Sequence, residues 1–172
     1  MGKVDNTLYT QVEKLVNEAA CRRLLEAYTY AIDWQNWAGL KELFWADAEF
    51  DFGLWQGDRE GFLPWVQALE EGYDRRLHHF ASPRLSIGDD EGQGEVGALL
   101  FMRVQEDGTA FDEIMAGRYQ LGFTRRGDEW RMSRLVFLMH GVQRLPATDN
   151  GGADFFADGL APSHPRFSQP TL

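Results

Sequence analysis

The feature that most constrains the fold is a change of hydrophobic period between the two halves of the chain. In the first 33 residues the apolar side chains recur at helical spacing, which predicts an amphipathic helix that ends at about Asp33. From Leu77 onward, four segments show the composition of strands. Helices followed by strands in this order predict an α+β domain. The helical positions are Val12, Leu15, Val16, Ala19, Leu25, Tyr28 and Ile32.

A second, short helix is expected after Asn36, whose side chain suits an N-cap. We expect this helix to end at Asp47 and Ala48. Its apolar stripe would consist of Trp37, Leu40, Leu43 and Phe44.

One strand and a third helix complete the first half. Glu49 to Trp55 alternates phenylalanine with carboxylates, which predicts a half-buried strand, and a turn is expected at Gly57. Asp58 is expected to cap a helix that ends near Gly72. Pro64 fits that helix only within the first turn.

The second half predicts a curved sheet. Its strand segments are LHHFASPRLSI, EVGALLFMRVQ, DEIMAGRYQLGF and EWRMSRLVFLMH, and short turns join the last three into an antiparallel meander. Gly117 and Gly122 predict bends or bulges that curl a sheet. We therefore expect a cone-shaped antiparallel or mixed sheet, wrapped around the N-terminal helices and enclosing an apolar pocket.

The domain organisation is simple. Residues 1–142 read as one domain, because no internal repeat or second domain is visible. Residues 143–172 are rich in Pro, Gly and Asp but also carry phenylalanines. We expect this tail to be a lid over its own subunit or a wrap around a neighbouring one, since apolar side chains gain nothing in solvent.

Composition excludes several functions. Lys and Arg total 17 against 27 Asp and Glu, and the net charge of −10 would repel nucleic acid. The single cysteine, Cys21, cannot form an internal disulfide and has no zinc-site spacing around it, so no metal is expected. The first residues do not show the apolar run of a signal peptide, and no stretch approaches the roughly 20 apolar residues of a membrane helix, so neither is expected. A cytoplasmic location is therefore expected.

Several segments carry a family resemblance, in this order: YAIDWQNWAGLKELFWADAEFDF, GDREGFLPWVQAL, RLHHFASPRL and GRYQLGFTRRGDEWRMSRL. From Val12 to His140 the chain resembles the SnoaL-like branch of the nuclear transport factor 2-like superfamily. The pattern is similar to that of scytalone dehydratase, lindane dehydrochlorinase and the bile-acid dehydratase, which use an Asp and His pair without a cofactor.

The resemblance implies roles for particular residues. It implies that Asp33 is the catalytic aspartate, that His78 or His79 is the histidine, and that Tyr28 is a pocket tyrosine. Ser82 stands where the family pattern, counted from His78, has an asparagine, so the choice between the two histidines stays open. The superfamily also contains non-catalytic subunits, so fold alone does not establish an enzyme.

The residues themselves support an Asp–His pair. Adjacent residues on a strand point to opposite faces, so only one of His78 and His79 can enter a pocket, and Phe80 favours the face of His78. Asp33, at the negative end of its helix, needs a partner that donates hydrogen bonds. An imidazole held by a carboxylate keeps one tautomer and acts as a base near neutral pH.

These features predict a cofactor-independent lyase or isomerase that is dehydratase-like or cleaves carbon–carbon bonds. Its substrate would be a small, bulky aromatic, polyketide-like or steroid-like molecule, and the protein would be a homodimer or homotrimer. The alternative is a non-catalytic ligand-binding or assembly module. The candidate substrate-binding residues, as hydrogen-bond donors or aromatic walls, are Tyr28, Tyr30, Trp55, Phe101, Arg118 and Arg134.

Overall fold

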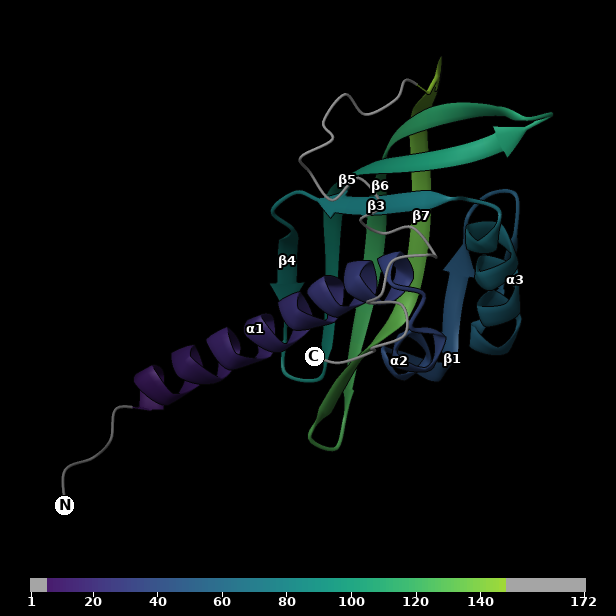
Figure 1. The fold of residues 1–172 in the computed structure, drawn as a ribbon. Coiled ribbons are helices and arrows are strands. Elements are labelled where there is room, and N and C mark those ends of the chain that lie inside the picture. The colour runs from purple at the N-terminus through teal and green to yellow at the C-terminus, as the bar shows by residue number, and fades with distance from the viewer. Residues whose placement is uncertain (1–5, 148–172) are drawn as a thin grey trace.

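The structure is a computed structural model that describes residues 6–147. Its three described helices are α1 (Asn6–Asp33), α2 (Trp37–Glu42) and α3 (Arg59–Glu71) (Figure 1). The described strands are β1 (Phe44–Asp51), β2 (Gln56–Asp58), β3 (Arg75–Phe80), β4 (Arg84–Ile87), β5 (Glu91–Glu106), β6 (Thr109–Arg126) and β7 (Glu129–Pro146).

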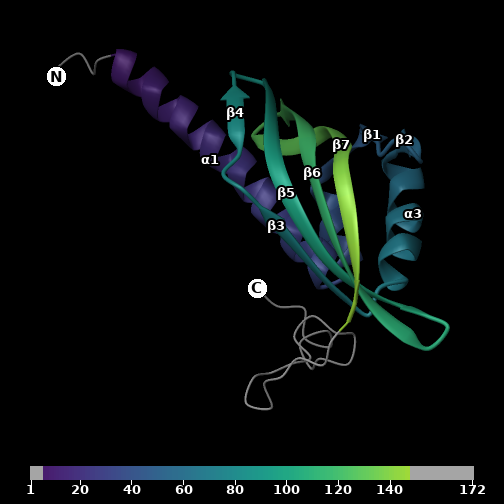
Figure 2. The same cartoon turned by 90° about the horizontal axis from the view of Figure 1, so that it is seen from above.

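All the described strands belong to one mixed sheet. Their order is β2-β1-β7-β6-β5-β3, and β4 also pairs with β5. The antiparallel meander of β5, β6 and β7 is confirmed, whereas β1 joins β7 in parallel. Helix α1 crosses one face of the curved sheet, and α3 lies beside β1 (Figures 1 and 2). The predicted α+β fold is confirmed, with a sheet that curves without closing.

The helix boundaries follow the predicted caps. Helix α1 ends at Asp33, and the Asn36 side chain accepts a hydrogen bond from the Gly39 amide at 3.0 Å. Asp58 caps the start of α3, and Gly72, near which the helix was expected to end, is its C-cap. The expectation that Pro64 must lie within the first turn was wrong, because α3 begins at Arg59 and Pro64 lies beyond its first turn. Pro64 has no amide hydrogen, so the backbone carbonyl of Glu60 lacks its usual helical donor. Glu60 is exposed to solvent.

The predicted boundary between the second helix and the first strand was wrong. Helix α2 ends at Glu42, and Phe44, expected on its apolar stripe, begins β1. Asp47 and Ala48, expected to end the helix, lie within β1. Phe44 is fully buried and pairs with Met132 of β7. Pairing with a strand distant in sequence therefore overrides the local helical spacing.

The turn after β1 lies earlier than predicted. Gly53 has a φ of +75° and its amide donates to the Asp51 side chain at 2.8 Å, so the chain reverses there. Gly57, the predicted turn, instead lies in β2 opposite Phe50. The short hairpin shortens the predicted strand, which ends at Asp51 rather than Trp55.

The segment from Leu77 to Ile87, predicted as one strand, forms β3 and β4. Both strands pair with β5, and residues 81–83 separate them. Pro83 lies in this interruption and has no amide hydrogen to give to a ladder.

An aromatic cluster fixes α3 against β1. Phe62 of α3 is fully buried, and its ring stacks on that of Phe50 with centroids 4.0 Å apart. Phe44 and Phe52 contact the same ring, at centroid distances of 5.8 and 5.7 Å. This packing holds the helix that carries Glu70 close to the sheet.

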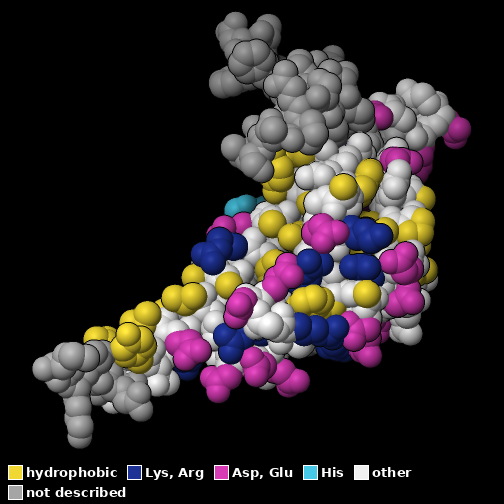
Figure 3. Space-filling model, turned by 90° about the horizontal axis from the view of Figure 1, so that it is seen from below, with side chains coloured by type: hydrophobic (Ala, Val, Ile, Leu, Met, Phe, Trp, Pro, Cys, Tyr) yellow, Lys and Arg dark blue, Asp and Glu magenta, His cyan; other side chains and the backbone are white. Residues whose placement is uncertain are grey.

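Only part of α1 packs as predicted. The first half of the helix extends beyond the sheet, and apolar side chains are exposed along it (Figures 1 and 3). Val12, Leu15 and Val16, predicted to face the core, are therefore exposed. The buried side begins at Asn17, whose side chain accepts a hydrogen bond from the Trp130 indole at 3.2 Å.

The predicted tail begins inside the sheet. Residues 143–146 form the end of β7, while the lid or wrap expected of the remainder falls on 148–172, outside the described residues. Within residues 6–147, no helix has the length and apolar character that crossing a membrane requires.

Candidate active site

Asp33 and His78 meet in the interior, although they are distant in sequence. The Nδ1 atom of His78 lies 2.8 Å from Oδ1 of Asp33. The backbone amide of His78 also donates to the same carboxylate, at 3.0 Å to Oδ1 and 3.1 Å to Oδ2. Both residues are buried. Because a carboxylate accepts hydrogen bonds, this contact places the ring proton on Nδ1 and leaves the Nε2 lone pair free.

The local structure explains this meeting. Asp33 is the last residue of α1, where helix carbonyl groups make the potential negative, and the two N–H groups of His78 compensate its charge. On β3, the side chain of His78 faces inward and that of His79 is exposed on the opposite face.

A mostly apolar cavity, which we call the inner cavity, lies beside this pair. Its volume is about 190 Å³, and His78, Glu70, Tyr28, Tyr73 and Tyr119 supply its polar groups. Helices α1 and α3 and strands β3, β5, β6 and β7 contribute its walls. Its apolar walls include Phe52, Trp65, Leu100, Met102, Met115 and Phe137.

Glu70 is a functional candidate that the sequence analysis missed. It is buried at the end of α3, with Oε2 3.2 Å from Nε of Arg76 and Oε1 3.9 Å from Nε2 of His78. Burial raises the pKa of Glu70, while the charges of His78 and Arg76 lower it less. The sequence did contain a sign of its burial: Glu70 follows Phe62 and Val66 at helical spacing and so lies on the buried stripe of α3.

Backbone hydrogen bonds hold Arg76 beside Glu70. Its Nη2 atom donates to the backbone carbonyls of Glu70 at 2.8 Å and Tyr73 at 2.6 Å. The guanidinium is almost fully buried, so its positive charge stays next to the Glu70 carboxyl.

Two tyrosines line the inner cavity near His78. Tyr28 of α1 and Tyr119 of β6 are buried, with ring centroids 5.9 Å apart. Burial raises the pKa of both side chains. Their hydroxyls therefore stay protonated and can donate hydrogen bonds. Tyr119 was not chosen because its neighbour Arg118 was expected on the inner face of this strand.

Three predicted substrate-binding aromatics lie outside the inner cavity. Tyr30 is half-buried and packs near Trp34, and Trp55 stacks on Trp65, with centroids 5.1 Å apart. Phe101 is 43% exposed. Its neighbours Leu100 and Met102 occupy the inner face of β5, and because side chains alternate along a strand, Phe101 lies on the opposite face.

The two predicted arginines also point away from the inner cavity. Arg118 is exposed and pairs with Glu95 at 2.6 Å, because Tyr119 takes the inner face of β6. Arg134 is exposed because the register of β6 and β7 shifts next to Gly122, with Ser133 as the extra residue. Such a bulge reverses the alternation of inward and outward side chains along β7, so Arg134, expected to contact substrate, points outward.

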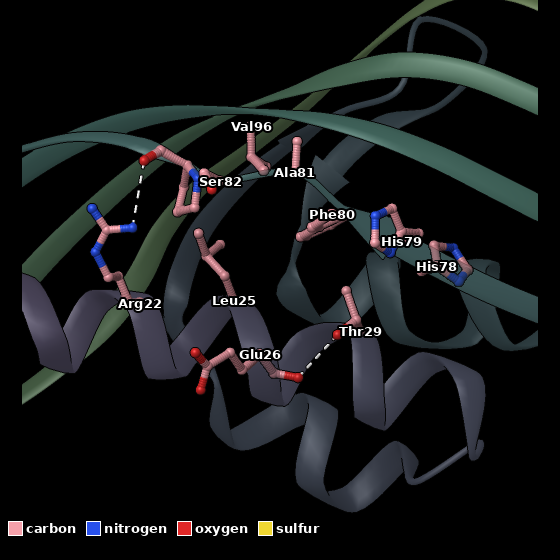
Figure 4. A pocket seen from close by; sticks show the side chains of 11 residues that line it. Arg22, Leu25, Glu26, Thr29, His78, His79, Phe80, Ala81, Ser82 and Val96 are labelled. Carbon is pink, nitrogen blue, oxygen red and sulfur yellow. Dashed lines mark hydrogen bonds between the residues drawn. The ribbon is translucent and has the colours of Figure 1, made fainter.

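A second hollow, which we call the α1 groove, opens between α1 and the segment around β3. It measures about 360 Å³ and is lined by polar residues of α1 such as Arg22, Glu26 and Thr29 (Figure 4). His78 and His79 lie at one end of it. His78 therefore borders both the α1 groove and the inner cavity.

No metal-binding group of three or more His, Cys, Asp or Glu side chains is found among the described residues. Cys21 is a buried free thiol, and burial, with a smaller effect of Glu18, raises its pKa to about 12. The chemistry that this arrangement offers is proton transfer by carboxyl, imidazole and phenol groups.

Comparison with known proteins places this geometry in context. The SnoaL-like domain family matches residues 13–136. No curated protein matches the chain.

Several solved structures share the fold. A type 2 hexachlorocyclohexane dehydrochlorinase, LinA, has a TM-score of 0.75 at 21% identity, covering 84% of this chain and 99% of that one. The type 3 enzyme of Novosphingobium barchaimii has a TM-score of 0.72 at 22% identity, with coverages of 80% and 96%. A candidate scytalone dehydratase of Novosphingobium aromaticivorans has a TM-score of 0.71 at 17% identity, with coverages of 80% and 93%.

Proposed function

The chain belongs to the SnoaL-like domain family, and from this premise we propose that it is a cofactor-independent lyase or isomerase whose base is His78, held by Asp33. The observation that carries the proposal is the 2.8 Å contact between Nδ1 of His78 and Oδ1 of Asp33 at the wall of an apolar cavity.

The base acts through Nε2. Asp33 accepts the Nδ1 hydrogen, so the neutral ring offers the Nε2 lone pair to a substrate C–H group. A group on the neighbouring carbon then leaves and a double bond forms. The imidazolium that results is stabilised by Asp33. General base catalysis of this kind supplies about 10² to 10⁴ in rate.

The tyrosines supply hydrogen bonds to the substrate. The Tyr28 and Tyr119 hydroxyls lie in the inner cavity and are kept protonated by burial. Loss of a proton next to a carbonyl puts negative charge on its oxygen, which such donors stabilise in an apolar site. The same base and donors serve an isomerisation or the cleavage of a carbon–carbon bond.

The size of the inner cavity favours a small substrate of one or two rings. Its volume of about 190 Å³ is of the order of the roughly 150 Å³ cavity that accommodates benzene. The steroid-like substrates considered from the sequence are larger than this. We propose a six-membered ring that loses hydrogen chloride or water, since the structural neighbours include a hexachlorocyclohexane dehydrochlorinase and a candidate scytalone dehydratase.

Two probe substrates test this function. The purified protein is incubated with hexachlorocyclohexane, with release of chloride measured, and with scytalone, with loss of water measured. We expect turnover of at least one probe, lost in His78→Ala and reduced in Asp33→Asn. His79→Ala is the matched control, because this neighbour lies on the opposite face of β3. Unchanged turnover in His78→Ala would remove the pair from the mechanism.

Exposed apolar residues favour a second candidate function, that of an assembly module. The sheet face opposite the inner cavity, which we call the outer face, exposes Leu77, Leu99, Phe101, Leu138 and Leu145. Burial of such a surface favours a homodimer or homotrimer. If the protein binds a ring compound tightly and returns it unchanged, the module is the better account.

The remaining expectations concern partners and location. A net charge of −10 favours a small-molecule partner over nucleic acid, and this stays a prediction. The cytoplasmic location also stays a prediction.

A further inference from the structure

We propose that Glu70 is the acid of this site, giving its proton to an oxygen leaving group while His78 takes the C–H proton. The inference deepens the proposed function and rests on it. Glu70 lies on α3, whereas Asp33 lies on α1. Of the two eliminations proposed above, the inference favours loss of water from a hydroxylated ring over loss of hydrogen chloride.

The geometry supports two groups acting on one substrate. Oε1 of Glu70 and Nε2 of His78 are 3.9 Å apart, too far for a direct hydrogen bond, and both residues line the inner cavity. A substrate lying against this wall can contact the carboxyl and the imidazole together. Neighbouring carbons of one ring bear the hydrogen and the hydroxyl, so the spacing suits an elimination.

Charge balance identifies the starting state. Arg76 lies 3.2 Å from Glu70, and Asp33 lies 2.8 Å from His78. These four buried groups carry no net charge when Glu70 and Nε2 of His78 share one proton. With the proton on Glu70, both groups are neutral; with it on His78, both are charged. Each side chain is at most 4% exposed, and an apolar cavity favours the neutral forms. Glu70 then starts as an acid and His78 as a base.

The groups that face Glu70 come from several elements. Arg76 and His78 of β3 lower its pKa, while Asp33 at the end of α1 raises it, and burial has the largest effect. Tyr28 and Tyr119 line the same cavity as neutral phenols. Tyr73 also lines it, and burial raises its pKa to about 12.

The elimination step balances with these two groups alone. Nε2 of His78 takes the substrate proton, and the C–H electron pair forms the double bond. The C–O bond breaks, and the departing oxygen takes the Glu70 proton and leaves as water. The site then holds a Glu70 carboxylate near a His78 imidazolium. A water molecule that accepts the Nε2 proton and gives one to Oε1 restores the starting state.

The leaving group provides the first test. Hydroxide is a poor leaving group and needs a proton, whereas chloride leaves without one. In Glu70→Gln, we expect dehydration of scytalone to fall by about 10²-fold or more, with chloride release from hexachlorocyclohexane changed less than about threefold. Glu71→Gln is the matched control, because its neighbouring carboxylate is exposed. Glu70→Asp keeps an acid and is expected to restore part of the dehydration.

Some outcomes of this test would overturn the proposal. Equal losses on both probes in Glu70→Gln would mean that Glu70 positions His78 and gives no proton. Unchanged dehydration would mean that it has no role. Thermal melting of each variant separates a loss of activity from a loss of folding.

A second test needs no substrate. Infrared spectra are recorded at pH 7 on protein whose glutamate side-chain carboxyls carry ¹³C. Glu70 is the only buried glutamate among the described residues, so a band of protonated glutamate is expected from it. Its absence would overturn the proposal. Failure of the wild type to turn over either probe would instead count against the proposed function and leave the infrared result to decide the state of Glu70.

Discussion

Asp33 holds His78 at two points, through the ring Nδ1 atom at 2.8 Å and through the backbone amide at 3.0 and 3.1 Å. The ring contact orients the imidazole, and the backbone contact ties the end of α1 to β3. The Asp33 carboxylate thus both fixes the tautomer of the His78 ring and holds the end of α1 against β3.

Replacement of Asp33 by asparagine tests the ring contact. The amide keeps the size of the side chain but can present its N–H₂ group to the imidazole, which would favour the wrong tautomer. We expect kcat/KM for the accepted probe to fall by about 10² to 10⁴, mostly through kcat. Steady-state kinetics measures this, and a thermal melt checks the fold. A change confined to KM would contradict the expectation.

Phe62 is expected to stabilise the region that carries Glu70. Its fully buried ring stacks on Phe50 at 4.0 Å, and truncation would leave a void between α3 and β1. We expect Phe62→Ala to lower the free energy of unfolding by about 3–5 kcal/mol, as measured by urea denaturation. Leu69→Ala on the same helix removes a partly exposed side chain and should cost less. Equal losses would show that the stacking does not anchor α3.

Cys21 gives a pH-dependent prediction. Burial raises the pKa of its thiol from 9.0 to about 12, so the folded protein keeps a proton that the unfolded chain loses above pH 9. Stability from this group is therefore fully present below pH 9 and is lost as the pH rises toward 12. The wild type should lose stability relative to Cys21→Ala over this range. A difference that does not change with pH would contradict the shift.

The outer face is expected to bury its apolar residues against another copy. Leu99 is 43% exposed near its centre, and a charge there would resist burial. We expect Leu99→Lys to lower the sedimentation mass to that of a monomer. Gln105→Lys, at an exposed position near the end of β5, adds the same charge and should leave the assembly intact. A wild type that sediments as a monomer would contradict the prediction.

The fold was largely predictable because its signals are local. The side chains of Asn36 and Asp58 cap their helices whatever lies elsewhere, and the turns between β5, β6 and β7 fix an antiparallel meander. Phe44 was misplaced because its pairing with Met132 involves a strand almost ninety residues away. Such pairing leaves no trace in local spacing.

The site was only partly predictable. Alternation along β3 correctly separated His78 from His79, since no bulge interrupts that strand. Arg134 was wrongly expected to contact substrate, because an extra residue in β7 reverses the alternation there. Glu70 was missed because its candidate role depends on its contacts with Arg76 and His78, and these contacts are visible only in the folded chain.

The most direct test of the account is the tautomer of His78. Nitrogen-15 NMR of the labelled imidazole at pH 7 distinguishes the protonated ring nitrogen from the unprotonated one. The account predicts a proton on Nδ1 and a free lone pair on Nε2, with loss of this preference in Asp33→Asn. A neutral ring with its proton on Nε2 would leave no base facing the inner cavity and would contradict the account.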